Sequence, residues 1–292
     1  MEISYFPGCT LKMHGKNFEK TALTVLNKFD INVMELKEWY CCGVVFSLSS
    51  DNLMHQLAPI RSLIKAKESG NKRLLTLCSM CYNTLKRASL LVSNDEEKRK
   101  KINDFMYMEE TEFKGDEIEI VHILKLIEEI NFDKIKKKII KKVDGLKIAP
   151  YYGCLLLRPK EIAIDSPELP SIMEKIFEAV GCESVYFPFK TECCGSYQIV
   201  NEKKIVIEQT KKIITSARKN GADLVVLSCP LCAYNLDSVQ KEIKEKEADF
   251  ETTPIFYFTQ LLALFMGIDP AINDFSLHCI DPRPMLEEKG LI

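Results

Sequence analysis

The sequence predicts an α/β protein made of two tandem, related βαβαβα domains, each with a mostly parallel sheet covered by helices. Three observations predict this fold class. Short apolar runs of strand length alternate with longer stretches of helical periodicity, this alternation occurs twice, and cysteines return at matching positions in both passes. A chain of 292 residues is long enough to bury a core in each of two such domains.

The first half is expected to alternate strands and helices three times. Its first strand runs into Gly8-Cys9, and its second helix ends before Gly70, a residue that often follows a helix because it adopts a left-handed conformation without strain. The expected elements cover residues 3–7, 17–29, 31–36, 53–69, 74–77 and 82–91.

The second half repeats this order. Its helices are expected to end before Gly181 and before Asn220-Gly221, where the apolar periodicity stops. The expected elements cover residues 147–152, 169–180, 184–187, 203–219, 224–228 and 231–245.

A lysine-rich segment joins the two halves. Residues 132–145 have apolar residues at helical spacing, which predicts a solvated amphipathic helix. Apolar helices are also expected around residues 121–130 and 257–266, each after a run of charged residues. We place the domain boundary near residue 145, which gives domains of residues 1–145 and 146–292.

Ten of the twelve cysteines belong to a duplicated frame. Each half contains Gly-Cys, then Cys-Cys-Gly, then a C-x2-C motif with Tyr-Asn shortly after it. The spacings are C-x31-CC-x35-C-x2-C in the first half and C-x38-CC-x34-C-x2-C in the second. This matched register indicates an internal repeat.

Composition disfavours several classes of function. The net charge of −2 disfavours binding to nucleic acid through gross basicity. The N-terminal residues show no signal-peptide pattern, so we expect a cytoplasmic, reducing setting in which cysteines serve metal or redox chemistry. The most apolar segment, residues 255–268, is shorter than the roughly 20 residues of a membrane-spanning helix. We therefore expect no membrane span, and interpret this segment as a core helix or a docking face.

The cysteines of each half are expected to meet at one edge of a sheet. The lone cysteine and the C-x2-C motif follow predicted strands, and the adjacent pair lies in the loop after the middle strand. Soft thiolate ligands select zinc, copper(I) or iron–sulfur clusters. Five thiols exceed the four ligands of a tetrahedral ion or an ordinary cubane, which favours an iron–sulfur cluster of unusual shape in each half. Zinc in at least one half is the alternative.

The frame resembles the CCG domain, a cysteine-rich module that occurs twice in several redox proteins, and the resemblance covers nearly the whole chain. The opening Tyr5-Phe6-Pro7-Gly8-Cys9-Thr10 is similar to the B-type chain of the heterodisulfide reductases of methanogenic archaea. This resemblance implies two noncubane [4Fe-4S] clusters, each held by five cysteines. The implied ligands are Cys9, Cys41, Cys42, Cys78 and Cys81 for the first cluster and Cys154, Cys193, Cys194, Cys229 and Cys232 for the second.

The resemblance also implies an activity and partners. The chain would be the catalytic subunit that reduces the heterodisulfide coenzyme M–S–S–coenzyme B to two thiols in archaeal methanogenesis. Each of two facing clusters would take one sulfur of the homolytically cleaved disulfide before protonation. Electrons would arrive singly from a ferredoxin-like partner in the same complex, fed by a flavin-containing partner, with a hydrogenase or formate dehydrogenase module as a further candidate partner.

Residues near the first cysteine of each half are candidates for substrate contacts. Both parts of the implied disulfide are anionic, so the cations Lys12, Lys16, Arg158 and Lys160 are candidate substrate-binding residues, although solvated loops also carry such residues. His14 is the candidate proton donor, because the release of thiols needs protons.

Two cysteines do not belong to the duplicated frame, and two alternative functions remain open. Cys182 and Cys279 have no counterpart in the other half and are expected to be buried, inert thiols. The first alternative function is an electron-relay subunit of a lactate, glycolate or glycerol-3-phosphate oxidising complex, and the second is a structural protein with zinc at one or both sites. No ferredoxin-type cysteine run is present, so ferredoxin-type clusters would have to belong to another polypeptide.

Overall fold

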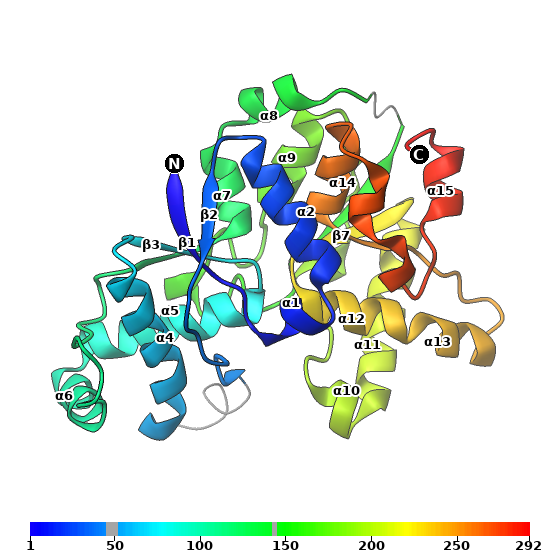
Figure 1. Ribbon diagram of the computed structural model, residues 1–292. Helices are drawn as coiled ribbons and strands as arrows, with labels where there is room; N and C mark the ends of the chain where they lie inside the picture. The colour runs from blue at the N-terminus through cyan, green and yellow to red at the C-terminus, as the bar shows by residue number, and fades with distance from the viewer. Residues whose placement is uncertain (45–51, 142–144) are drawn as a thin grey trace.

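Two parallel sheets of four strands each lie at the centre of the two halves (Figure 1). The computed structural model describes residues 1–44, 52–141 and 145–292. The strand order is β2-β1-β3-β4 in one sheet and β6-β5-β7-β8 in the other, so the two halves share one topology. The strands are β1 (Glu2–Phe6), β2 (Asn32–Glu35), β3 (Arg73–Thr76), β4 (Glu119–His122), β5 (Lys147–Tyr151), β6 (Glu183–Ser184), β7 (Leu224–Leu227) and β8 (Ile255–Tyr257).

Helices connect the strands of the first half. The first long helix, α2, buries Phe18, Ala22 and Val25 along one face, as their helical spacing predicts. The described helices of this half are α1 (Cys9–Met13), α2 (Lys16–Asn27), the 3₁₀ turn η1 (Leu53–Gln56), α4 (Leu57–Glu68), α5 (Ser79–Asn94), α6 (Glu96–Phe105), α7 (Ile123–Glu129) and α8 (Phe132–Lys138).

The second half has a similar set of helices. Helix α11 begins and ends at the residues predicted for it, and Gly221 follows it with a φ of 87°. The described helices are η2 (Lys160–Ile162), α9 (Ile172–Ala179), η3 (Pro188–Thr191), α10 (Gln198–Asn201), α11 (Lys203–Lys219), α12 (Pro230–Ser238), α13 (Gln240–Lys246), α14 (Phe258–Phe265), η4 (Pro270–Asn273), η5 (Phe275–Leu277) and α15 (Arg283–Glu288).

The predicted parallel α/β architecture and its duplication are confirmed, but the prediction of three strands in each half is wrong. Each sheet has a fourth strand, β4 or β8, that pairs with the strand before the C-x2-C motif. These strands have only four and three residues, and a helix follows each without a loop. Their apolar residues therefore merge with the helix pattern in the sequence, and only pairing with a distant strand distinguishes them.

The lysine-rich connection between the halves is shorter in its helical part than predicted. Helix α8 ends at Lys138, and its apolar residue Ile135 is buried, whereas Ile140 beyond the helix is exposed. The rest of the predicted helix includes residues 142–144, which lie outside the described residues. The domain boundary near residue 145 stays a prediction.

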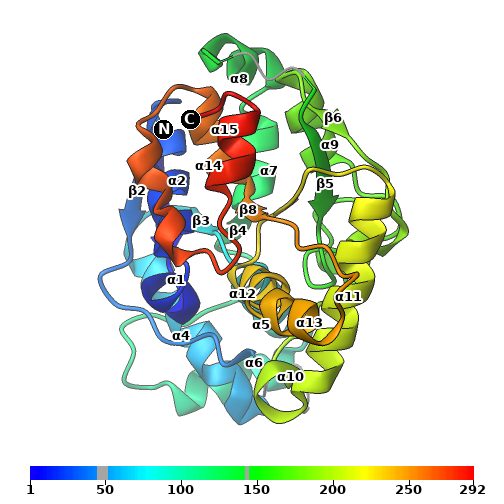
Figure 2. The same ribbon diagram turned by 90° about the vertical axis from the view of Figure 1, so that its right-hand side faces the viewer.

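The two halves pack together through equivalent pairs of helices. Helix α2 of the first half contacts α14 of the second, and α9 of the second contacts α7 of the first (Figures 1 and 2). The helices α2 and α9 follow the first strand of their sheets, and α7 and α14 follow the fourth. The contacts of α1 with α12 and of η2 with α5 form a second equivalent pair across the two halves. The halves are therefore related by an approximate twofold axis.

The apolar segment of residues 255–268 lies within this interface. Every residue of α14 is buried, which agrees with a core helix. The hydroxyl groups of Thr21 and Thr259 are hydrogen-bonded at 2.8 Å across the α2–α14 contact. The rings of Phe18 and Tyr257 are stacked at a centroid distance of 4.3 Å. No helix in the described ranges has the length and apolar content needed to cross a membrane.

We expect Phe18→Ala to lower the free energy of unfolding by about 3–5 kcal/mol, because it leaves a cavity between the halves. Urea unfolding followed by circular dichroism measures the change. The matched control is Tyr107→Ala, which removes a side chain that is 79% exposed and should change stability by less than about 0.5 kcal/mol. Equal effects of the two substitutions would contradict the role of the stacked pair in the interface.

Candidate metal centre

The strands deliver the frame cysteines to one edge of each sheet. Cys78 and Cys229 lie two residues after β3 and β7, and each precedes the first residue of a helix, α5 or α12. Cys9 is the first residue of α1 and lies three residues after β1. Cys154 has the same separation from β5. The predicted placement of the lone cysteine and the C-x2-C motif is therefore present in both halves.

The glycine before the first cysteine of each half allows a close approach between chain segments. Gly8 has a φ of 73°, and a Cβ atom there would lie 2.8 Å from the sulfur of Cys81. Gly153 has a φ of 66°, and a Cβ atom there would lie 3.4 Å from the sulfur of Cys232. A side chain at Gly8 would collide with a frame thiol, and one at either position would strain the backbone. The repeated Gly-Cys pair thus has a physical reason in both halves.

The ten frame thiols form one continuous series of neighbouring side chains. The sulfur atoms of Cys9 and Cys41 are 3.9 Å apart, and those of Cys194 and Cys232 are 3.5 Å apart. The thiols of Cys78 and Cys229 interact with each other, which joins the set of one half to the set of the other. In order of contact the series is Cys9, Cys41, Cys42, Cys81, Cys78, Cys229, Cys232, Cys194, Cys193 and Cys154.

The series is symmetric about the contact between Cys78 and Cys229. On each side the order is the first cysteine of the C-x2-C motif, then its second cysteine, then the two of the adjacent pair, then the lone cysteine. None of the described His, Cys, Asp and Glu side chains form a group of three or more that could hold a single metal ion. The thiols instead extend as two rows of five that meet end to end.

Burial differs between the two ends of the series. Cys9 and Cys41 are exposed, Cys154 and Cys193 are half-buried, and the other six frame thiols are buried. All five thiols of the second set line one cavity of about 20 Å³, which also contacts Ser79 and Met80 from the first half. Hydrogen bonds from the thiols of Cys232 and Cys78 hold the pKa of Cys229 well below its ordinary value, which favours the thiolate that binds metal.

The donor set fits iron–sulfur clusters. Each half supplies five soft thiol ligands in one contiguous row, and sulfur ligands favour such clusters over hard cations. The residues that would hold one cluster are the five frame cysteines of the first half, and those that would hold the other are the five of the second.

A largely buried ion pair orients the loops of the second set. The ammonium group of Lys190 lies 2.7 Å from the carboxylate of Glu174 and donates to the carbonyl of Pro170 at 2.8 Å. The carbonyl of Lys190 accepts hydrogen bonds from the backbone N–H groups of Tyr152, at 2.8 Å, and Gly153, at 3.2 Å. The loop before Cys154 is thereby tied to the loop before Cys193.

The asparagine that follows each C-x2-C motif fixes a neighbouring loop. The amide of Asn235 donates to the carbonyls of Cys194 and Ser196, at 3.3 and 2.8 Å. The amide of Asn83 instead donates to the carbonyls of Leu155 and Arg158 in the other half, at 2.8 and 2.7 Å. One asparagine therefore holds its own Cys-Cys loop, and the other holds the two halves together.

The candidate substrate-binding cations have different surroundings. Lys12 forms ion pairs with Glu19 at 2.9 Å and Glu35 at 2.7 Å, so its charge is already compensated. The exposed Arg158 donates to the carbonyl of Thr191 at 3.1 Å. Lys16 and Lys160 are exposed.

The histidine and the two extra cysteines have clear positions. His14 is exposed, and its ring lies 5.8 Å from that of Tyr234 on α12. Cys182 is buried, as predicted, and burial raises its pKa to about 12. The prediction that Cys279 is buried is wrong, because its side chain is exposed on the C-terminal segment, where its backbone N–H donates to Asp237 of α12.

Three aromatic residues near the thiols were not found from the sequence. His122 and Tyr257 end the fourth strands, and each pairs with the residue two positions before Cys78 or Cys229. Tyr197 lies after the second Cys-Cys-Gly motif. Burial and the nearby thiols of the first half, Cys78 foremost among them, raise its pKa, so it faces the other half's set. Tyr197 could have been found from its position two residues after Cys-Cys-Gly. His122 and Tyr257 could be found only once the fourth strand of each sheet was known.

The fold and the site together define a duplicated α/β protein in which two cysteine sets meet at one junction. The sequence model of the cysteine-rich CCG domain matches residues 3–86 and 148–237. The chain belongs to this family, with two copies of the domain, and is similar over most of its length to the B-type chains of heterodisulfide reductases.

Two of the named relatives are subunits of reductases. The chain is 31% identical over 268 residues to the 8-methylmenaquinol:fumarate reductase membrane anchor of Wolinella succinogenes, covering 91% of this chain and 93% of that protein. It is 29% identical over 273 residues to the B-type chain of a ferredoxin/F420H2-dependent CoB-CoM heterodisulfide reductase from Methanosarcina acetivorans, covering 92% and 90% of the two chains. A protein of Archaeoglobus profundus that is named for its likeness to such B-type chains is 26% identical over 294 residues, covering 95% and 94%.

A solved structure has the same fold. A hypothetical protein from Helicobacter pylori superposes with a TM-score of 0.75 at 14% identity, over 95% of this chain and 51% of that chain. Together, the sequence relatives support a place in an oxidoreductase complex, and the solved structure supports the fold.

We expect Lys190→Met to lower the free energy of unfolding by about 3–5 kcal/mol, because it leaves the largely buried carboxylate of Glu174 without its cation. Urea unfolding measures the change. The matched control is Lys203→Met, which breaks an exposed pair with Glu242 and should cost less than about 1 kcal/mol. A loss below about 1 kcal/mol for Lys190→Met would show that the pair does not hold the two loops.

Proposed function

We propose that this chain is the part of an electron-transferring complex that reduces a disulfide, coenzyme M–S–S–coenzyme B, to two thiols. The observation that carries the proposal is the contact between Cys78 and Cys229, which brings two equivalent five-thiol sets end to end. A disulfide has two sulfur atoms to reduce. A junction with an equivalent five-thiol set on each side offers one set to each sulfur atom. The similarity to the B-type chain of a heterodisulfide reductase, over more than nine-tenths of this chain, supports the same reaction.

In this proposal the two five-cysteine rows each hold a noncubane [4Fe-4S] cluster. Such clusters, when bound, supply single electrons beside the substrate. The residues of the chain do the remaining work. The glycines before Cys9 and Cys154 let the loops close over the thiols, and the Lys190–Glu174 pair holds the second set in place. Lys16 and Lys160 attract the anionic groups of the substrate.

Lys12 and Arg158 have a smaller part in substrate binding in this proposal. Lys12 is neutralised by two carboxylates, and Arg158 uses one donor on a backbone carbonyl, so both act as supports of their loops. His14 supplies protons from the surface near Cys9. The partners are a ferredoxin-like protein and a flavin-containing protein of the same complex, and the setting is the cytoplasm of a methanogenic archaeon.

A second candidate is an electron-relay function in which the chain does not touch a disulfide. The 31% identity to the membrane anchor of a quinol:fumarate reductase favours it, since that relative's name describes a different overall reaction. Clusters held by the two rows of thiols would then carry electrons across the junction. Zinc in one of the two sets is a third arrangement, and metal analysis distinguishes it.

Turnover of the heterodisulfide tests the proposal. The full chain, loaded with iron and sulfide under anaerobic conditions, should oxidise reduced methyl viologen when coenzyme M–S–S–coenzyme B is added, because the two reducing equivalents end on its sulfurs. Loss of the viologen colour measures the rate, and the control is the same mixture without disulfide. Rapid reduction of the loaded protein without any disulfide-dependent turnover would favour the relay function.

Metal content tests the assignment of the ligands. The loaded wild type should contain about eight iron atoms per chain, four for each cluster. Cys193→Ala should lose about half of this iron or convert one cluster, whereas Cys182→Ala, which removes a buried thiol outside the series, should lose none. Iron and zinc are measured by plasma mass spectrometry. An equal loss from both variants would show that the duplicated frame does not identify the ligands.

A further inference from the structure

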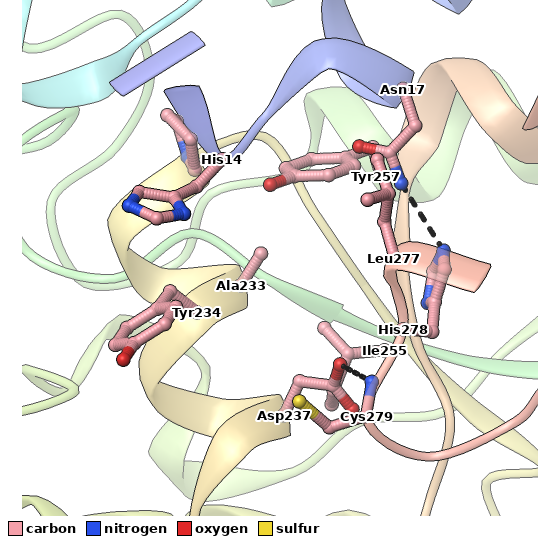
Figure 3. Close-up of a pocket in the computed structure, with 11 residues that line it drawn as sticks. His14, Asn17, Ala233, Tyr234, Asp237, Ile255, Tyr257, Leu277, His278 and Cys279 are labelled. Carbon is pink, nitrogen blue, oxygen red and sulfur yellow. Dashed lines mark hydrogen bonds between the residues drawn. The ribbon is translucent and has the colours of Figure 1, made fainter. Parts of the chain in front are cut away.

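A small polar pocket lies beside the junction of the two thiol sets (Figure 3). It has a volume of about 50 Å³ and is bounded by α1 and α2 of the first half and by α12, β8 and the C-terminal segment of the second. Its polar lining includes His14, Tyr257 and Asp237. Pro230, which lies between Cys229 and Cys232 in the sequence, forms part of its wall, so the pocket reaches the second C-x2-C motif.

Tyr257 connects this pocket to the junction. In the β7–β8 pairing Tyr257 lies opposite Leu227, two residues before Cys229. The stacked ring of Phe18 fixes its ring, and its hydroxyl points toward His14 across the pocket (Figure 3). Burial, and after it the thiols of Cys229 and Cys78, raise its pKa, which agrees with a position within electrostatic reach of both.

The equivalent place in the first half is closed. His122 ends β4 as Tyr257 ends β8, but both of its ring nitrogens are occupied, by the carbonyl of Leu77 at 3.1 Å and the N–H of Leu124 at 3.3 Å. Tyr82, the residue after Cys81, packs its ring 5.9 Å from that of His122. The residue after Cys232 is Ala233, whose small side chain lines the pocket. The pocket thus lies where the second half has Ala233 at the position that Tyr82 has in the first half.

The pocket is suited to water. A polar cavity holds a water molecule when it exceeds about 10–15 Å³ and offers two to four polar partners, and this pocket meets both conditions. Asp237 accepts hydrogen bonds from the N–H groups of Cys279 at 2.6 Å and Ile280 at 3.0 Å, which holds its carboxylate at the pocket wall. Burial raises the pKa of Asp237 to about 6, so it can exchange protons with water near neutral pH.

We propose that this pocket is a water-filled proton entry on one side of the junction, with the Tyr257 hydroxyl as its inner end. The inference rests on the proposed disulfide reduction, which consumes two electrons and two protons for each disulfide. The O–H bond of Tyr257 breaks as an S–H bond forms on a product thiolate, and a pocket water returns a proton to the phenolate. That proton comes from solvent through His14 and Asp237. The electrons come from the ferredoxin-like partner of the proposed complex, which reduced methyl viologen replaces in the assay.

Two variants test the entry. Tyr257→Phe removes the hydroxyl but keeps the stacked ring, and Ala233→Tyr fills the pocket as Tyr82 fills the equivalent place. Both should keep the wild-type iron content and the wild-type rate of reduction by viologen without disulfide. Both should lower heterodisulfide turnover by about tenfold or more, as expected for the loss of a proton-transfer group, and increase the solvent deuterium isotope effect. Tyr107→Phe, which removes an exposed hydroxyl, is the matched control and should change nothing.

High-resolution crystal structures give a readout that is independent of turnover. The wild type should show ordered water within hydrogen-bonding distance of the Tyr257 hydroxyl, and Ala233→Tyr should lack it. A dry pocket in the wild type, or turnover of both variants within twofold of the wild type, would overturn the proton entry while leaving disulfide reduction intact. Absence of turnover in the loaded wild type would instead overturn the proposed function, and the proton entry with it.

Discussion

The position of the site depends on the reciprocal packing of helices between the two halves. Helix α2 packs on α14 and α9 packs on α7, so each half covers the fourth-strand helix of the other. This reciprocal packing brings the carboxyl edges of two separate sheets to one junction and lets the thiols of Cys78 and Cys229 meet. Each half alone would leave α7 or α14 with an uncovered apolar face. The candidate metal centre and the core of the protein therefore share one interface.

The duplicated halves are equivalent in topology but not in detail. Both place a C-x2-C motif after the third strand and a glycine before the lone cysteine, because the same backbone approaches recur. They differ in exposure, since Cys9 and Cys41 reach solvent while the second set lines a small cavity. They also differ at the residue after the C-x2-C motif. Tyr82 packs against His122 in the first half, whereas the small side chain of Ala233 lines a pocket in the second. In the proposed function, this difference would let the two thiol sets share one electron chemistry while protons enter on one side.

Much of the architecture and the cysteines of the candidate metal centre were predictable from the sequence. The repeat of cysteines identified all ten residues that the structure brings into one series, because ligand chemistry constrains residue type and spacing directly. Helix α11 was predictable to the residue, since its apolar periodicity ends at Asn220-Gly221. The strands β4 and β8 were not, because three or four residues directly before a helix carry no period of their own. Missing these strands also hid His122 and Tyr257, which end them.

The duplication, the parallel α/β class and the two sets of five thiols follow from the sequence alone, because these depend on local periodicity and on chemistry that only cysteine supplies. Packing between distant residues is what places Cys78 beside Cys229, neutralises Lys12 with Glu19 and Glu35, and opens a pocket beside Tyr257. These features depend on contacts between residues far apart in the chain. Such contacts follow from the packing of whole helices and sheets, which no short stretch of sequence encodes.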